Sequence, residues 1–191
     1  MNSSTGTVTK KSKNFLLTEG AICIALSTVL SLISIIKMPL GGSVTLLSMM
    51  PVCVYSLRHG IKYGLFAAFV YSLLQLFLDL GAVMSWGITP LALVGCFLFD
   101  YILAFTSLGL AGIFGNRSVK NQIFGVIFAI ILRFFMHIIS GTLIFACWMP
   151  EEWNSPLLYS VCYNGAYMLP ELITTSIAAP FIVKALSKIK K

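Results

Sequence analysis

Residues 122–148 read QIFGVIFAIILRFFMHIISGTLIFACW, and this stretch decides the fold. It is long enough to cross a bilayer, because about 20 predominantly apolar residues suffice for a helix to span the hydrocarbon. Arg133 is its single charged side chain. Backbone polar groups find no water in the hydrocarbon region, so a spanning segment of this kind must bond internally as a helix. The stretch therefore predicts a membrane-spanning helix.

The composition of the whole chain supports the same class of protein. The chain has 191 residues, of which 58% are hydrophobic and 10% charged, and its mean hydropathy is +0.94. Soluble domains carry about 25% charged residues. The alternative of a soluble all-helical domain with a large core is disfavoured, because too few polar side chains remain to cover its surface. We expect an all-α integral membrane protein.

Apolar runs repeat along the chain and predict a six-transmembrane-helix bundle. The second run is short and is interrupted by Pro51, so we expect it to be tilted or partly re-entrant. The gaps are too short for a second domain; we expect a tail over 1–14, a membrane domain over 15–187 and a basic end over 188–191. The expected helices cover residues 15–36, 43–57, 61–80, 91–114, 122–148 and 157–186.

The basic residues predict the direction of the chain in the membrane. Cytoplasmic segments of membrane proteins are enriched in lysine and arginine. With the N-terminus inside, eleven basic residues are cytoplasmic and Lys37 alone is outside. Both termini are then cytoplasmic, which agrees with an even number of helices. The eleven are Lys10, Lys11, Lys13, Arg58, Lys62, Arg117, Lys120, Lys184, Lys188, Lys190 and Lys191.

Several classes of function are disfavoured. The net charge of +7 is spread over the chain ends and short gaps rather than along a stripe with exposed aromatics, so we expect no nucleic-acid partner. The five cysteines lie scattered in apolar runs without a CxxC pair, so we expect neither a metal site nor a disulfide framework. GxxxxGK[ST], GxSxG and HExxH motifs are absent. We expect no enzyme activity and no cofactor.

Charged residues inside the apolar runs are the first candidates for a functional site. A charge near the bilayer centre costs about 2.5–3.5 kcal/mol on insertion scales, and Asp100, Arg133 and Glu171 lie deep by position. His137 follows Arg133 by four residues and shares its helix face. We expect these groups to meet Gly141, Tyr159 and Asn164 in a pocket that opens outward. The alternatives are an Arg133 ion pair with Asp100 or Glu171 that only fixes packing, and a packed neutral His137.

Aromatic and small residues add two weaker signals. Phe145, Trp148, Trp153 and Tyr163 offer flat faces to a ligand, and aromatic faces attract cationic rings. For the two tryptophans, anchoring at the membrane interface is the alternative. Small residues four apart on the first helix allow another helix to approach closely; these are Ala21 and Ala25.

Four stretches of the sequence resemble the thiamine-specific substrate-binding (S) subunits of energy-coupling-factor (ECF) vitamin transporters. The most specific one combines LRFFMHIISG at 132–141 with YSVCYNGAYMLPE at 159–171, because polar residues recur there at fixed places. The others are LLTEGAICIA at 16–25, MPLGGSVTLLSMMP at 38–51 followed by SLRHG, and FDYILAFTSLGLAG at 99–112.

This resemblance implies a subunit of a prokaryotic plasma membrane that captures thiamine from outside. It implies delivery through a separate transmembrane coupling subunit and two cytoplasmic ATPases, with Ala21 and Ala25 facing the coupling subunit. Some family members have glutamate at position 100, lysine at 133 and tryptophan at 145. Stacking on the thiazolium is therefore open between Phe145, Trp148 and Trp153. The ligand-binding positions that it implies are Asp100, Tyr101, Arg133, His137, Gly141, Tyr159 and Asn164.

Further expectations depend on this ligand. We expect a lid over it from the loops at 38–45 and 148–156. Three alternatives remain open: an S subunit for another vitamin, a stand-alone secondary transporter with Asp100, His137 and Glu171 as a proton relay, and a membrane enzyme.

Overall fold

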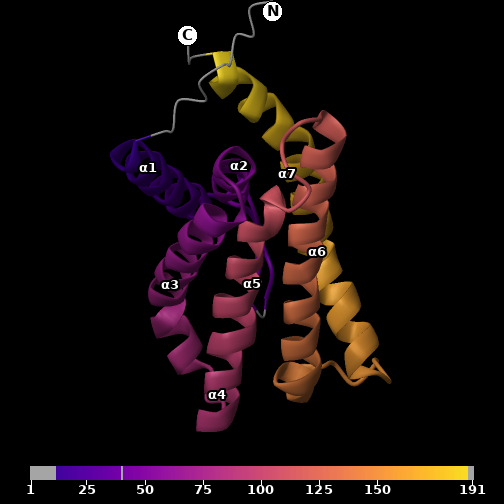
Figure 1. Cartoon of the computed structure of the whole chain (residues 1–191). Helices are drawn as coiled ribbons and strands as arrows, with labels where there is room; N and C mark the ends of the chain where they lie inside the picture. The colour runs from indigo at the N-terminus through magenta and orange to yellow at the C-terminus, as the bar shows by residue number, and fades with distance from the viewer. Residues whose placement is uncertain (1–11, 40, 189–191) are drawn as a thin grey trace, which may run out of the picture.

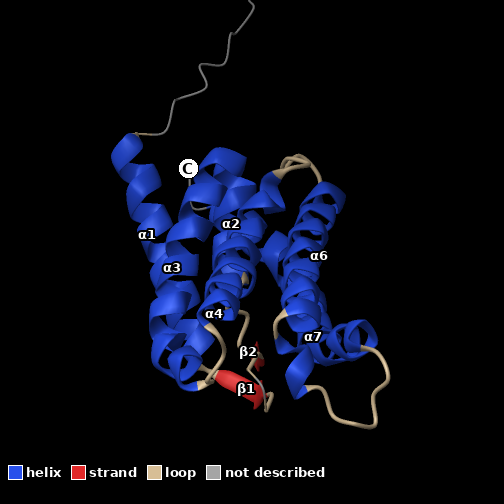
Figure 2. Ribbon diagram, turned by 90° about the horizontal axis from the view of Figure 1, so that it is seen from below, coloured by secondary structure: helices blue, strands red, loops and turns tan. Residues whose placement is uncertain are grey.

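The computed structural model describes residues 12–39 and 41–188. It is a mostly helical bundle with a small β-hairpin at its side (Figures 1 and 2). In chain order the elements are α1 (Lys13–Leu32), β1 (Ser34–Lys37), β2 (Ser43–Thr45), α2 (Met50–His59), α3 (Ile61–Ser85), α4 (Pro90–Cys96), η1 (Phe97–Leu103), α5 (Ala104–Thr106), η2 (Ser107–Gly112), α6 (Val119–Leu143), η3 (Phe145–Trp148) and α7 (Pro156–Lys188).

Five helical segments are long and apolar enough to cross a membrane. They are Lys13–Leu32, Ile61–Ser85, Pro90–Gly112, Val119–Leu143 and Pro156–Lys188. The helix α2 lies outside these segments; it has 10 residues and a length of about 15 Å at 1.5 Å per residue, roughly half the hydrocarbon thickness. The predicted helical membrane protein is therefore confirmed, whereas the count of six helices stays a prediction.

The hairpin corrects two of the predicted helices. Residues 33–36 and 43–45 were expected to be helical, but β1 and β2 pair in antiparallel register there, with Ser34 opposite Thr45 and Lys37 opposite Ser43. Gly41 and Gly42 form the turn with φ of +91° and +81°, which glycine adopts without steric cost. Short apolar runs do not distinguish strand from helix by periodicity, and this is why the prediction was wrong.

The segment Pro90–Gly112 changes helix type along its length. Thr89 caps its start, since the side chain accepts a hydrogen bond of 3.3 Å from Ala92 N. An α-helical start is followed by the π-helical η1, the short α5 and the 3₁₀-helical η2. The predicted helix at 91–114 is thus in place, but its middle is wider than an α-helix. π-Helical turns occur frequently at functional sites, and this one carries Asp100 and Tyr101.

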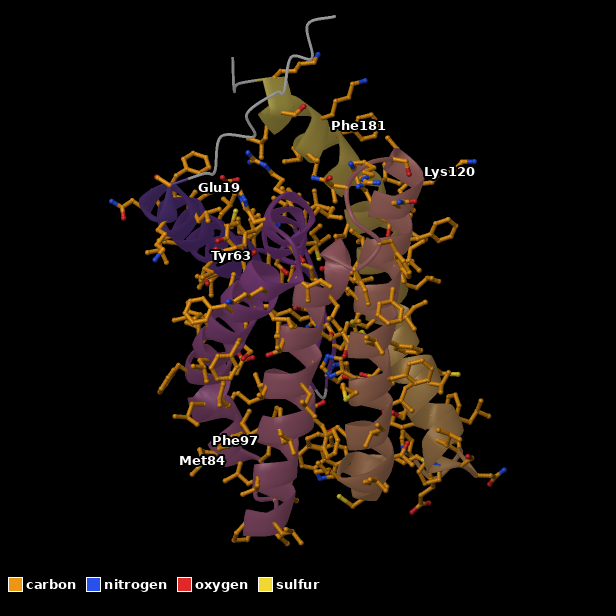
Figure 3. All side chains as sticks on the ribbon, in the orientation of Figure 1. Glu19, Tyr63, Met84, Phe97, Lys120 and Phe181 are labelled. Atoms are coloured by element: carbon orange, nitrogen blue, oxygen red, sulfur yellow. The ribbon has the colours of Figure 1, made fainter. Side chains whose placement is uncertain are left out.

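Both ends of the described chain lie at the same end of the bundle. The start of α1 and the end of α7 are both at the upper end of the bundle in Figure 1. Glu19 and Lys120 lie near this end in Figure 3, whereas Met84 and Phe97 lie near the other. Lys10, Lys11, Lys190 and Lys191, with most of the expected tail and basic end, fall outside the described residues.

Candidate ligand-binding site

A cavity of about 440 Å³ lies among the hairpin, α3, η1, α6 and α7. Figure 2 shows the hairpin between α4 and α7, on one side of this space. Small-molecule pockets measure about 300–1,000 Å³, so the volume suits a ligand of vitamin size. Eight predicted ligand residues line the cavity: Asp100, Tyr101, Arg133, His137, Gly141, Phe145, Tyr159 and Asn164.

A chain of hydrogen bonds joins α6 to the π-helical turn. Helix geometry places Arg133 and His137 one turn apart on one face, and Arg133 Nε donates to His137 Nε2 at 3.3 Å. His137 Nδ1 lies 2.9 Å from Asp100 Oδ1, and Ser140 Oγ donates to Asp100 Oδ2. Because Nε2 accepts, Nδ1 carries the proton and donates to the carboxylate. A neutral imidazole thus links the guanidinium to the carboxylate.

Arg133 forms neither of the ion pairs considered from the sequence. Among the described residues its guanidinium lies over the Phe105 ring, with Cζ 3.9 Å from the centroid. Asp100 is engaged by His137 and Ser140, and Glu171 by the hairpin. The alternative of a direct pair is therefore disfavoured, because both carboxylates have nearer hydrogen-bond donors.

On α7, Asn164 is held by a second set of hydrogen bonds. Its Nδ2 donates to Ser160 O at 2.9 Å, and its Oδ1 accepts from Tyr167 Oη at 2.7 Å. Gly141 on α6 packs against Ser160, whose Oγ a Cβ at position 141 would strike. The glycine therefore allows α6 and α7 to approach closely at the cavity wall, and the amide is oriented before any ligand enters.

Glu171 fastens the hairpin to α7. The side chain is fully buried, and its Oε1 accepts hydrogen bonds of 2.5 Å from both Thr45 N and Thr45 Oγ1. The other oxygen, Oε2, is buried without a hydrogen-bond partner among the described residues. Tyr163 Oη also donates to Gly41 O at 2.9 Å. Gly42 lies against the Tyr167 ring, so closely that a Cβ would be 2.6 Å from Cε1.

Aromatic rings form the wall beside α6. Phe145 and Trp86 line the cavity, with ring centroids 5.6 Å apart and planes nearly perpendicular. Trp148 is behind them, 5.3 Å from Phe145 and 5.9 Å from Trp86, and it does not line the cavity. Trp153 packs on Tyr159 at 5.3 Å and is likewise outside the lining. The part of the predicted lid at 148–156 therefore contributes nothing to the cavity wall described here.

Several residues that line the cavity were not predicted from the sequence. Trp86 had been left in a loop at 81–90, but α3 continues to Ser85 and brings it to the cavity. Asp79, at the end of the predicted third helix, accepts a hydrogen bond of 3.1 Å from Tyr101 Oη. A tyrosine every four residues on α7 was a signal that could have found Tyr167.

The charges of the lining suit a cationic, hydrogen-bonding ligand. Three carboxylates face two basic side chains around the cavity, since His137 is neutral in the network above. Aromatic faces add attraction for a positively charged ring. The charged lining residues are Lys37, Asp79, Asp100, Arg133 and Glu171.

Comparisons with known proteins identify the family of the chain. The family described as "Thiamine transporter protein (Thia_YuaJ)" matches residues 17–191. The "Thiamine transporter ThiT" of Bacillus subtilis is 30% identical over 176 residues, which cover 84% of this chain and 86% of that protein. A structure of ThiT from Listeria monocytogenes matches with a TM-score of 0.71 at 25% identity, covering 93% of this chain and 98% of that one.

A second solved structure has the same fold. It is described as the S component of a bacterial ECF transporter and matches with a TM-score of 0.62 at 21% identity, covering 94% of this chain and 100% of that one. The family resemblance noted in the sequence is confirmed by the match over residues 17–191. The chain belongs to the thiamine transporter protein family.

Proposed function

We propose that this chain is the thiamine-binding S subunit of an ECF-type importer and captures thiamine in the cavity described above. The observation that carries the proposal is the Arg133–His137–Asp100 chain beside the Phe145–Trp86 wall, within a member of the thiamine transporter family. A carboxylate, an oriented amide and aromatic faces match the amine, ring nitrogens and cationic thiazolium of thiamine. The subunit acts as a transporter component and carries out no reaction on its ligand.

Each lining group has a proposed role. Asp100 accepts hydrogen bonds from the aminopyrimidine, and its charge favours the cationic ligand. His137, Tyr159 and Asn164 orient the rings and the hydroxyethyl tail, while Tyr101 and Gly141 shape the wall. Phe145, together with Trp86, covers the thiazolium, because both rings face the cavity while Trp148 and Trp153 do not. Arg133 holds His137 in the position from which it donates to Asp100, and it also lines the cavity.

The hairpin is the proposed lid. It is tied to α7 through Thr45 and Gly41, and its residues line one side of the cavity. Ligand entry then requires these contacts to open on the outward side. The bundle would lie in a prokaryotic plasma membrane with the upper end of Figure 1 in the cytoplasm. In that orientation both termini are cytoplasmic and α2 counts as a sixth, short helix.

Delivery to the cytoplasm is assigned to separate subunits. Ala21 and Ala25 are exposed on α1, where small residues let a helix of the coupling subunit approach. The two ATPases would drive reorientation of the whole subunit. Replacing both alanines with tryptophan should leave thiamine binding intact and abolish uptake. Normal uptake by this double variant would contradict the docking role.

One experiment separates this function from an ion-coupled transporter. Thiamine uptake is measured in cells that carry the chain, with and without the coupling subunit and ATPases, and with and without a proton uncoupler. The proposal is supported if uptake requires the partner subunits and continues during brief treatment with the uncoupler while the ATP concentration is maintained. Uptake that needs no partner and collapses with the uncoupler would favour a relay through Asp100, His137 and Glu171. No hydrogen bond in the described residues joins Glu171 to the other two, which disfavours such a relay.

A further inference from the structure

A buried ionic cluster lies between α1 and α2, outside the cavity lining. Glu19 of α1 forms an ion pair with Arg58 Nη1, and its other carboxylate oxygen lies 3.0 Å from His59 Nε2. The exposed fractions of the Glu19, Arg58 and His59 side chains are 14%, 10% and 1%. Figure 3 shows Glu19 near the upper end of the bundle. We call Glu19, Arg58 and His59 the α1 clamp.

Ring and backbone contacts surround the α1 clamp. The His59 ring packs on Tyr55 at 4.8 Å and on Phe15 at 6.4 Å. Tyr55 Oη donates to Leu16 O at 2.9 Å, and a Cβ on Gly20 would lie 3.0 Å from the Tyr55 ring. The first two turns of α1 therefore rest on the C-terminal end of α2, which fixes both the position and the rotation of α1.

The later part of α1 is held by hydrogen bonds from α3, since Tyr71 Oη donates to Ser27 O at 3.5 Å and Gln75 Nε2 donates to Ser31 Oγ at 2.8 Å. The face of α1 that carries Ala21 and Ala25 is exposed. Among the described residues the α1 clamp supplies every ion pair that involves α1. A buried ion pair is weak evidence for stability, because its desolvation cost offsets the attraction. Its directional bonds do fix one rotation of the helix about its axis.

We propose that the α1 clamp is a positioning device that holds the Ala21–Ala25 face of α1 toward the coupling subunit. Glu19, Arg58 and His59 are positioning residues, acting on transport without touching thiamine. The inference rests on the proposed function, in which α1 meets the coupling subunit. It predicts that loss of the α1 clamp leaves thiamine binding intact and weakens association with the coupling subunit.

The location of the α1 clamp adds a physical reason for this separation. α2 begins after the hairpin and ends at His59, and Gly60 alone, with φ of +87°, joins it to α3. Residues Pro51–Leu57 of α2 are all buried. α2 is thus fixed in the bundle independently of Glu19. The end of α1 next to the cavity, where Ser31 and Leu32 line the wall, is held separately by Tyr71 and Gln75 of α3. Breaking the α1 clamp therefore loosens the first half of α1 while the cavity wall keeps its contacts.

The test uses three variants of the full subunit in lipid nanodiscs. Glu19→Gln removes the carboxylate charge, and the pair Glu19→Arg with Arg58→Glu restores an ion pair with reversed signs. Glu152→Gln, in the exposed loop before α7, is the matched control for loss of one negative charge. Thiamine affinity, thermal stability with bound thiamine, association with the purified coupling subunit–ATPase module, and uptake are measured for each.

We expect the Kd of Glu19→Gln for thiamine to stay within about twofold of that of the unsubstituted chain. Substitutions at distant sites without shared contacts act independently, and Glu19 shares no contact with the cavity. Its association with the coupling module should weaken by at least about tenfold, and uptake should fall in parallel. The reversed pair should recover association to within about threefold, and Glu152→Gln should behave as the unsubstituted chain.

Three outcomes would overturn the proposal. Association and uptake of Glu19→Gln within twofold of the unsubstituted chain would remove the positioning role. A parallel loss of thiamine binding and thermal stability would make the α1 clamp a general support of the fold. If the reversed pair associated with the coupling module as weakly as Glu19→Gln does, the ion pair would not set the orientation of α1. Failure of the unsubstituted chain to bind thiamine would instead contradict the proposed function.

Discussion

Replacing Asp100 with alanine tests the centre of the binding site. Its two carboxylate oxygens already receive hydrogen bonds from His137 Nδ1 and Ser140 Oγ, which hold the carboxylate in place for the ligand. Each oxygen can accept more than one hydrogen bond, so the aminopyrimidine can bind without displacing these donors. A hydrogen bond to a charged group contributes about 1.5–3 kcal/mol. Loss of one such bond should raise the Kd for thiamine roughly 10- to 150-fold.

Isothermal titration calorimetry of the purified subunit measures this change. Asp100→Asn should lose less affinity, because an amide oxygen still accepts a hydrogen bond while the charge is gone. Glu151→Ala, in the exposed loop between η3 and α7, controls for net charge and should keep the affinity of the unsubstituted chain. An unchanged Kd in Asp100→Ala, with the variant folded, would refute the role of this carboxylate.

Three further predictions concern the hairpin and the aromatic wall. Glu171→Gln should speed thiamine dissociation about five- to tenfold in stopped-flow measurements, because a neutral acceptor holds the hairpin less strongly; an unchanged rate would contradict the lid. Trp86→Phe should remove most of the fluorescence change on thiamine binding, since Trp86 is the cavity-lining tryptophan, and an undiminished change would contradict its placement. Gly42→Ala should lower affinity at least about 5- to 30-fold, because left-handed strain of about 1–2 kcal/mol adds to the close approach of the new Cβ to the Tyr167 ring. Gly115→Ala, also at positive φ but in open space, should leave affinity unchanged, and equal effects of the two would contradict the reasoning.

The membrane helices and much of the cavity were predictable because helix geometry is regular. Once residues 122–148 are a helix, Arg133, His137 and Gly141 must lie on one face. The positions of the long helices followed from apolar length alone. The eight predicted ligand residues that line the cavity came from this regularity and from the family resemblance. Their contact with thiamine stays a prediction.

What the sequence did not predict depends on contacts between distant segments. The hairpin is tied to α7 by the contact of Thr45 with Glu171, and no local pattern specifies a contact between residues so far apart in the chain. The π-helical turn at Phe97–Leu103 has the composition of an ordinary apolar helix. Trp86 reaches the cavity because α3 runs past its expected end. Glu19 has no predictable role in the sequence, because its partners Arg58 and His59 lie on another helix.

The most direct test of the account is a fluorescence titration of the purified subunit, without coupling subunit or nucleotide. Thiamine should quench tryptophan emission saturably, because Trp86 lines the cavity and Trp148 packs against it. Riboflavin and biotin, used as control vitamins, should give no saturable change at the same concentrations. Absence of a response to thiamine, or an equal response to riboflavin or biotin, would contradict the claim that this chain binds thiamine specifically.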